Sequence, residues 1–285
     1  MTRISPTLVD EFTRAATLPH PGELAPAALT IARIAYPALD AAPYIERLDE
    51  LGARVAARIA GDDAHGSLAV INQLLFDDLG FVGNRSRYHD PRNSFLNDVL
   101  DRRTGIPISL GTVYIEVARR IDLAVYGVNF PGHFLLTAPT ASETIVLDPF
   151  DAGAVLSRSD CERLWHRYVP VECPFDRAAL TPASKPEVLA RMLQNLKRLF
   201  VELRAFQKAW AVAELLVALD PTALTEVRDR GLIAYQLRDF SAALRDLEAY
   251  LRLARVDAGD KAAKQEQGHV WEHVKALRRR VAGMN

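Results

Sequence analysis

Gly105-Ile-Pro-Ile-Ser109-Leu110 begins an apolar pattern with helical spacing that continues to about Ile121. The apolar segment Val125-Tyr-Gly-Val-Asn-Phe-Pro-Gly-His133-Phe-Leu-Leu136 follows, and after a short polar loop the chain continues as Ile145-Val-Leu-Asp148. These stretches predict a helix, then a strand that carries His133, then a strand that ends in Asp148.

Ser109, His133 and Asp148 are the candidate catalytic residues. In one interpretation Ser109 is a nucleophile, His133 is its base and Asp148 orients the imidazole. In the other, Ser109 caps the helix with its side-chain oxygen, which is the usual role of serine at a helix start. His133 also has a structural interpretation as a core residue of the strand, and Asp148 has one as the beginning of a turn before Pro149.

The order of these residues resembles the core of the transglutaminase-like (papain-like) superfamily. In that superfamily a cysteine at a helix N-terminus is activated by a histidine and an aspartate on the next two strands. No cysteine precedes Asp148 in this chain, and the cysteine position falls on Ser109 or on Pro107. The resemblance therefore implies the fold, and it implies that His133 and Asp148 lie on neighbouring strands, within hydrogen-bond reach of each other and facing the start of the helix. It also implies that thiol-based chemistry, including transglutaminase activity, is absent.

Longer motifs carry a narrower resemblance. Gly80-Phe-Val-Gly-Asn84, Tyr88-His-Asp-Pro-Arg-Asn-Ser94 and Phe130-Pro-Gly-His-Phe-Leu-Leu136 resemble the bacterial SirB-type family. This resemblance implies a transglutaminase-like N-terminal domain, C-terminal tetratricopeptide repeats and a cytoplasmic, bacterial setting. It implies no particular reaction, because the family takes its name from a regulatory association.

Arg92 and Asn93 are candidate binding residues, since their loop directly precedes the helix that begins near Gly105. Their side chains are suited to gripping a carboxylate or a peptide carbonyl. The alternative, which the abundance of turn-forming residues favours, is that they hold the loop together by Asx-type turns.

The last hundred residues repeat at an offset of 34. Leu203-Arg204 aligns with Leu237-Arg238, Phe206 with Phe240, Ala209 with Ala243 and Leu219 with Leu253. A helix-turn-helix period of this length is typical of tetratricopeptide repeats. A final helix over residues 262–281 would cap the stack. An ordinary helical hairpin is the alternative.

These patterns predict an α+β protein in which a transglutaminase-like domain is followed by an all-α repeat region. The first domain should span residues 1–155, with helices over residues 27–34, 42–59 and 67–79 forming a layer against a small antiparallel sheet. Residues 156–187 contain four prolines and predict a turn-rich linker with one short helix over residues 161–168. Residues 188–285 should form the repeats and the terminal capping helix.

Composition limits the possible functions. The chain has 285 residues, a net charge of −1 and 49% hydrophobic residues, which are values typical of a soluble globular protein and argue against a nucleic-acid or membrane binder. Its N-terminus has no apolar leader segment, so we expect a cytoplasmic protein. Cys161 and Cys173 are expected to be reduced, buried thiols.

No cofactor or metal is implied by the sequence. His269-Val-Trp-Glu-His273 matches the order of zinc-binding residues in the inverted zinc proteases, but too little chain follows to supply another ligand. A solvated helix face is therefore the preferred interpretation of this motif.

Two functions compete on these grounds. The first is a non-catalytic adaptor or regulatory protein, a pseudoenzyme whose repeat groove binds a protein or peptide partner. The second is a serine hydrolase or acyltransferase that acts on an amide or ester through Ser109, His133 and Asp148. The sequence favours the adaptor, because the repeats are present while the nucleophile is only inferred.

Overall fold

The computed structural model describes residues 5–17, 23–61, 63–254 and 261–282. The chain divides into two compact units. One comprises residues 10–192, and the other comprises residues 193–285 together with the start of the chain, residues 1–9. Helices α1 (Pro6–Ala16) and α8 (Lys185–Glu202) contribute residues to both.

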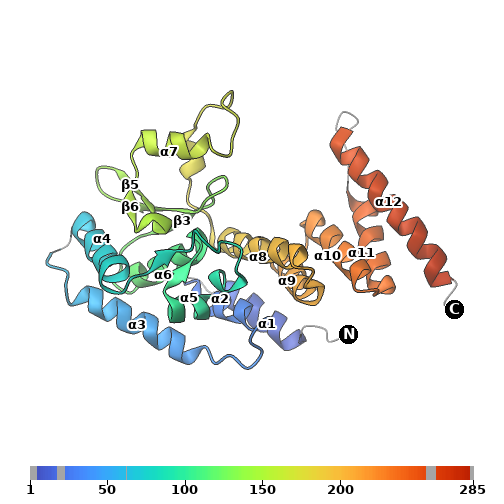
Figure 1. Ribbon diagram of the computed structural model, residues 1–285, viewed down its shortest axis with the longest axis horizontal. Coiled ribbons are helices and arrows are strands. Elements are labelled where there is room, and N and C mark those ends of the chain that lie inside the picture. Colours follow the sequence, from blue (N-terminus) through green and yellow to red (C-terminus); the bar gives the residue numbers. More distant parts are fainter. Residues whose placement is uncertain (1–4, 18–22, 62, 255–260, 283–285) are drawn as a thin grey trace. The chain divides into compact units, whose positions relative to one another are not determined.

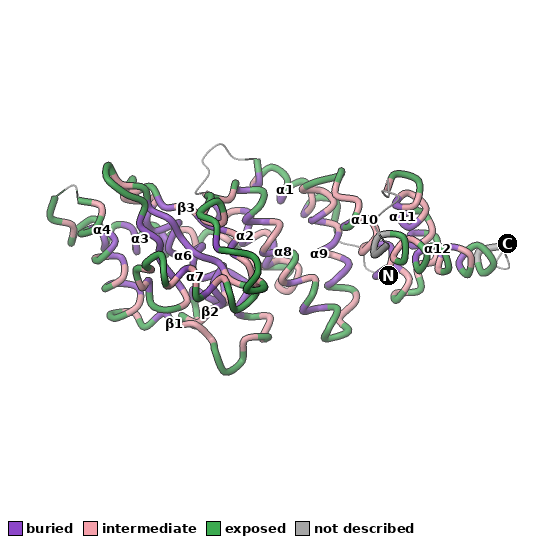
Figure 2. Tube along the Cα trace, turned by 90° about the horizontal axis from the view of Figure 1, so that it is seen from above, coloured by how far each residue is buried: buried purple, intermediate pink, exposed green. Residues whose placement is uncertain are grey.

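Helix α6 (Pro107–Arg119) is the centre of the unit formed by residues 10–192. Twelve of its residues are buried, and Figure 2 shows buried residues running along it. It lies between α3 and the four-stranded sheet (Figure 1). The other helices of this unit are α2 (Ala25–Ala32), α3 (Ala42–Ala56), α4 (Ala64–Asn72), α5 (Leu96–Arg102) and α7 (Arg158–Trp165).

The α+β class is confirmed, and helices lie close to the three N-terminal ranges expected from the sequence. The third range differs in detail, because α4 continues as a π-helical segment, Gln73–Asp78. Helix α1 was not among the helices that the sequence patterns predicted.

The sheet has four antiparallel strands in the order β3 (Tyr126–Val128), β4 (Leu135–Pro139), β5 (Thr144–Asp148) and β6 (Ala154–Val155). Leu136 of β4 is paired with Leu147 of β5. A separate parallel pair joins β1 (Val82–Gly83) to β2 (Thr104–Gly105), immediately before α6.

His133 does not lie on a strand, which corrects the sequence-based expectation. It ends a turn in which its N–H donates to the Phe130 carbonyl oxygen at 3.1 Å, and β4 begins only at Leu135. Pro131 and Gly132 explain the difference. Proline suits the second position of a turn and Gly132 adopts a φ of 64°, which is the left-handed value that a type II turn requires at its third position.

Residues 156–180 pack against the sheet. Cys161 and Leu164 of α7 and Phe175 share one hydrophobic cluster with Val128 and Phe130.

Both cysteines are free, but Cys173 is exposed, so the expectation of two buried thiols is wrong for Cys173. Cys173 lies beyond the end of α7 in a turn-rich stretch, where its backbone is held by two hydrogen bonds: its carbonyl accepts the Trp165 indole N–H at 2.9 Å, and its N–H donates to the Pro170 carbonyl oxygen at 3.0 Å.

The repeat unit keeps the 34-residue period in its backbone. Helices α9 (Phe206–Leu219) and α11 (Phe240–Leu253) begin and end at equivalent positions, and α8 and α10 (Leu224–Gln236) end 34 residues apart, at Glu202 and Gln236. Arg204 and Arg238, the aligned residues before α9 and α11, have left-handed φ values of 56° and 60°. Helix α12 (Lys261–Ala282) packs on α11. No strand is present within the described part of residues 193–285.

Candidate functional site

A cleft with a volume of about 500 Å³ opens in the unit formed by residues 10–192. His133, Asp148 and Pro107 line it on the side of the sheet and α6. Arg163 and Arg167 line it on the side of α7. The cleft therefore contains two of the three candidate catalytic residues.

His133 and Asp148 form a close pair, as the sequence led us to expect. The His133 Nε2 atom lies 2.9 Å from each of the two carboxylate oxygens of Asp148. The side chains are only 11% and 13% exposed. A carboxylate accepts a proton, so the pair favours the tautomer in which Nε2 carries the hydrogen.

Asp148 is fixed by backbone groups as well as by His133. As the last residue of β5 it caps a short 3₁₀ helix, and its Oδ1 accepts the Phe150 N–H at 2.9 Å. The Gly153 N–H donates to the Asp148 carbonyl oxygen at 2.8 Å. Asn72 holds the same loop, because its Nδ2 donates to the Gly153 carbonyl oxygen at 3.0 Å. Asn72 lies 81 residues from Gly153 in the chain, and no local pattern marks it.

Pro107 is the residue at the start of α6 that lines the cleft beside the pair. Its ring carries no nucleophilic atom, and a proline has no backbone N–H. Pro107, one of the two positions at which the superfamily resemblance expects a thiol, thus offers neither a nucleophile nor a hydrogen-bond donor for a developing oxyanion.

Ser109 is buried away from the cleft. It is 0% exposed and is not one of the residues that line the cleft. Its Oγ donates to the Asn93 carbonyl oxygen at 2.6 Å and accepts the Ile106 N–H at 3.0 Å. Ser109 is therefore not the N-cap, which is Ile106, but the third residue of α6, and its second bond satisfies the N–H of the N-cap as the side chain at that position does in a capping box. The structure therefore joins His133 to Asp148 but not to Ser109.

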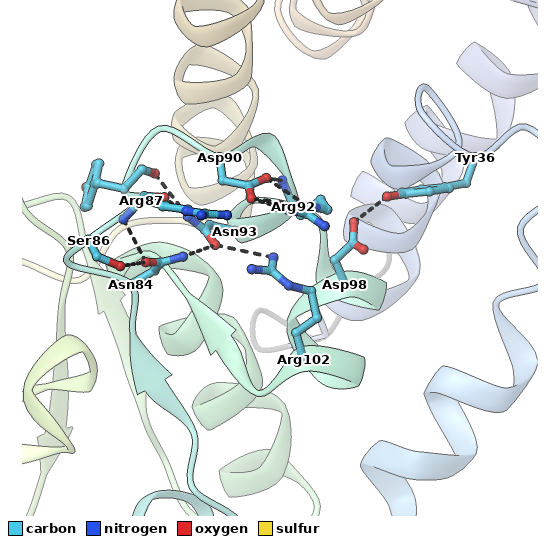
Figure 3. A network of polar contacts seen from close by, with 10 residues as sticks. Tyr36, Asn84, Ser86, Arg87, Asp90, Arg92, Asn93, Asp98 and Arg102 are labelled. Atoms are coloured by element: carbon cyan, nitrogen blue, oxygen red, sulfur yellow. Dashed lines mark hydrogen bonds and ion pairs between the residues drawn. The ribbon is translucent and has the colours of Figure 1, made fainter.

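Asn93 organises the loop before α5, as Figure 3 shows. Its Nδ2 donates to the Arg87 carbonyl oxygen at 2.7 Å, and its Oδ1 accepts the Asn84 Nδ2 at 3.0 Å. Asn93 is 0% exposed, and its own carbonyl receives the Ser109 hydroxyl. Its side chain therefore holds the loop and the start of α6 together.

Arg92 forms an ion pair with Asp90 of the same loop (Figure 3). The Arg92 Nη2 lies 2.7 Å from an Asp90 carboxylate oxygen, and this hydrogen-bonded guanidinium lowers the pKa of the Asp90 carboxyl. Neither Arg92 nor Asn93 lines the cleft. The bonds they make are of the loop-stabilising kind that the sequence offered as the alternative.

Figure 3 also shows a partly buried hydrogen bond between Tyr36 and Asp98. The Tyr36 hydroxyl donates to Asp98 at 2.8 Å. Burial, together with this bond, raises the pKa of Tyr36 to about 12. Burial also raises the pKa of the Asp98 carboxyl, against the opposing effect of the Tyr36 hydrogen bond.

Several residues of the cleft wall were not identified from the sequence. The Phe150 ring meets the His133 ring edge to face, with the centroids 6.1 Å apart. The Arg85 guanidinium lies 4.9 Å from the centroid of Phe150. Tyr168 packs on Gly132, where a Cβ atom would come within 2.3 Å of its ring. Tyr168 lies in the turn that follows α7, and no sequence period marks this contact.

No group of three or more residues suited to holding a metal ion occurs in the described part of the chain. In the motif that ends at His273, the His273 ring packs against the Tyr235 ring at 5.1 Å, while His269 is exposed. Among the described helices, none combines the length and apolar character needed to cross a membrane.

Comparison with known proteins agrees with the two-part architecture. A family model described as the transglutaminase-like superfamily matches residues 42–194, and a tetratricopeptide-repeat model matches residues 196–278. A UPF0162 protein of Xylella fastidiosa (strain Temecula1) is 39% identical over 234 residues, which cover 79% of this chain and 82% of that protein.

More distant similarity extends beyond that species. A UPF0162 protein of Pseudomonas aeruginosa is 34% identical over 240 residues, covering 82% of this chain and 86% of that protein. The mouse F-box only protein 21 is 30% identical over 232 residues, which cover 75% of this chain but 36% of that protein. No solved structure matches the chain.

Proposed function

The chain belongs to the transglutaminase-like superfamily together with the UPF0162 proteins, and from that premise we propose that it is a non-catalytic adaptor or regulatory protein. In this proposal the transglutaminase-like unit is a pseudoenzyme that keeps its cleft. The repeat unit binds a protein or peptide partner through its groove. The SirB-type assignment and the cytoplasmic setting inferred from the sequence are part of the same proposal.

Pro107 is the observation that carries the proposal. It lines the cleft beside His133 and Asp148 and supplies neither a nucleophilic atom nor an N–H group. No serine, threonine or cysteine is among the described residues that line the cleft, so the His133–Asp148 pair has no aliphatic hydroxyl or thiol there to activate in a covalent mechanism.

The serine-hydrolase alternative has weaker support. Ser109 would have to exchange two hydrogen bonds at the start of α6 for one to His133. A hydroxyl with no exposed surface is also inaccessible to a substrate in the cleft.

Repeats of this type commonly bind proteins or peptides, and this chain contains a matched repeat region. The presence of that region favours an interaction role over the inferred serine mechanism. Nothing in the composition favours nucleic acid or a membrane as the partner.

Labelling with a fluorophosphonate probe tests the proposal. The wild-type protein and the variants Ser109→Ala and His133→Ala are expected to remain unlabelled, while a serine hydrolase carried as a positive control reacts. Labelling of the wild type that disappears in both variants would establish the serine mechanism and refute the adaptor proposal.

A further inference from the structure

The carboxylates and guanidinium groups that line the cleft are paired with neighbouring side chains, except at one position. Each carboxylate of the lining has a basic partner: Asp148 with His133, Asp151 with Arg85 at 3.1 Å, and Asp160 with Arg163. Arg167, in the turn that follows α7, also lines the cleft. Within the described part of the chain its guanidinium has no hydrogen bond or ion pair.

This unmatched guanidinium indicates the charge of a ligand. Arginine binds a carboxylate through two parallel hydrogen bonds. A single unpaired guanidinium matches a single negative charge, whereas a doubly charged phosphate would lack a second cation, because Arg85 and Arg163 already pair with Asp151 and Asp160. The cleft therefore favours a monocarboxylate.

His133 offers the complementary group. Asp148 engages Nε2, and in the neutral imidazole the other ring nitrogen, Nδ1, then has a free lone pair. Among the described residues none hydrogen bonds to Nδ1. A largely buried acceptor of this kind is suited to an N–H donor from a ligand.

The remaining lining is partly apolar. Phe150, Leu156, Leu164 and Tyr168 line the same cleft, and Tyr168 is 56% exposed. The cleft volume of about 500 Å³ lies within the range typical of small-ligand sites, in which apolar walls surround a few polar groups.

We propose that the cleft binds a carboxylate with an adjacent N–H donor, as found in a free amino acid or in the C-terminal residue of a peptide. Arg167 holds the carboxylate, His133 Nδ1 accepts the N–H, and the apolar wall contacts the side chain. The inference deepens the proposed function, because a cleft that lacks a nucleophile is left to bind its ligand rather than convert it.

Calorimetric titration of the full chain tests this site with three probes: acetyl-alanyl-leucine, the same peptide with a C-terminal amide, and free leucine. The acetylated acid or free leucine is expected to bind, and the peptide amide is expected to bind at least about tenfold more weakly because it lacks the charge. Binding of the acetylated acid alone identifies a peptide C-terminus as the ligand, and binding of free leucine identifies an amino acid.

Arg167→Ala should weaken binding of the preferred probe by about tenfold or more, and Arg167→Lys should weaken it less. Arg158→Ala is the matched control, since Arg158 is an exposed arginine of α7 that pairs with Glu162 at 2.9 Å and does not line the cleft. It should leave binding unchanged. His133→Ala should weaken binding too, with its folding checked by circular dichroism.

Equal affinity for the acid and the amide, or an unchanged affinity in Arg167→Ala, would overturn the inference. So would the absence of binding by all three probes. Mass spectrometry of the recovered acetyl-alanyl-leucine shows whether the peptide was cleaved. It therefore distinguishes failure of the binding site from failure of the proposed function. Binding with cleavage of the peptide would refute the non-catalytic proposal but keep the site, whereas loss of binding without fluorophosphonate labelling would refute only the site.

Discussion

Pro107 and Ser109 lie two positions apart on α6, yet their environments differ completely. Pro107 lines the cleft, and Ser109 is enclosed by its bonds to Asn93 and Ile106. A thiol at a helix N-terminus beside an imidazole loses its proton readily, because the helix dipole and a nearby imidazolium stabilise the thiolate. The two positions should therefore respond differently when each is replaced by cysteine.

We predict that Pro107→Cys creates a reactive thiol and that Ser109→Cys does not. In a Cys173→Ser background, Pro107→Cys should react with iodoacetamide at pH 7 at least about tenfold faster than Cys173 does in the wild type. Mass spectrometry of the alkylated peptides measures both rates. Cys161 should contribute little, because burial raises the pKa of its thiol. Faster alkylation of Ser109→Cys than of Pro107→Cys would contradict this assignment of the vacated position.

At the scale of elements, Glu116 of α6 secures the start of α2. Its Oε1 accepts the Leu24 and Ala25 N–H groups at 2.6 and 2.5 Å, and its other oxygen pairs with Arg120 at 2.6 Å. Glu116 is 0% exposed. The carboxylate therefore satisfies donors at a helix N-terminus, where a negative charge is favoured.

Glu116→Gln should lower the free energy of unfolding by about 3 kcal/mol, because it removes the buried charge that pairs with Arg119 and Arg120 and leaves Arg120 only the exposed Asp49 as an ionic partner. Urea denaturation followed by circular dichroism measures the change. Glu162→Gln, which breaks an exposed pair on α7, is the control and should cost no more than about 1 kcal/mol. Equal losses in the two variants would show that Glu116 has no special role.

Asp246 of α11 plays a comparable part within the repeats. Its carboxylate is 3% exposed, and its Oδ2 accepts a hydrogen bond from the Nε–H of Arg230 of α10 at 2.7 Å. Asp246→Ala should destabilise the protein by about 3 kcal/mol, since Arg230 loses a buried partner. Glu248→Ala on the same helix removes an exposed pair with Arg278 and should cost about 0–1 kcal/mol. Thermal denaturation of both variants compares them directly, and the prediction fails if Glu248→Ala is the more damaging.

At the scale of the whole molecule, the positions of Cys161 and Cys173 decide whether a transglutaminase reaction is possible. Transglutaminase chemistry needs a thioester, and neither Cys161 nor Cys173 lines the cleft. We predict that the full chain incorporates no biotinylated amine into a glutamine-containing protein, in an assay where an active transglutaminase serves as the positive control. Incorporation by the wild type that is lost in Cys173→Ser would show that a thiol outside the cleft is competent.

Local patterns were sufficient to predict much of the fold. The 34-residue offset marks the repeat helices, because each pair must present the same small and apolar residues to its neighbours. The resemblance of this chain to the transglutaminase-like superfamily implied that His133 and Asp148 are in contact, which the 2.9 Å separation confirms. Pro131 and Gly132 also indicate the turn at His133, but the apolar residues that follow led us to predict a strand there instead.

The rest of the site depends on contacts between residues far apart in the chain. Asn72 reaches Gly153 across 81 residues, and Asn93 receives the Ser109 hydroxyl across 16. The sequence by itself determined that a histidine and an aspartate are present, that no thiol precedes Asp148, and that the C-terminal region repeats. Only the tertiary structure decided that Pro107 and not Ser109 lines the cleft, because the direction of a side chain at a helix start depends on the loop that packs against it.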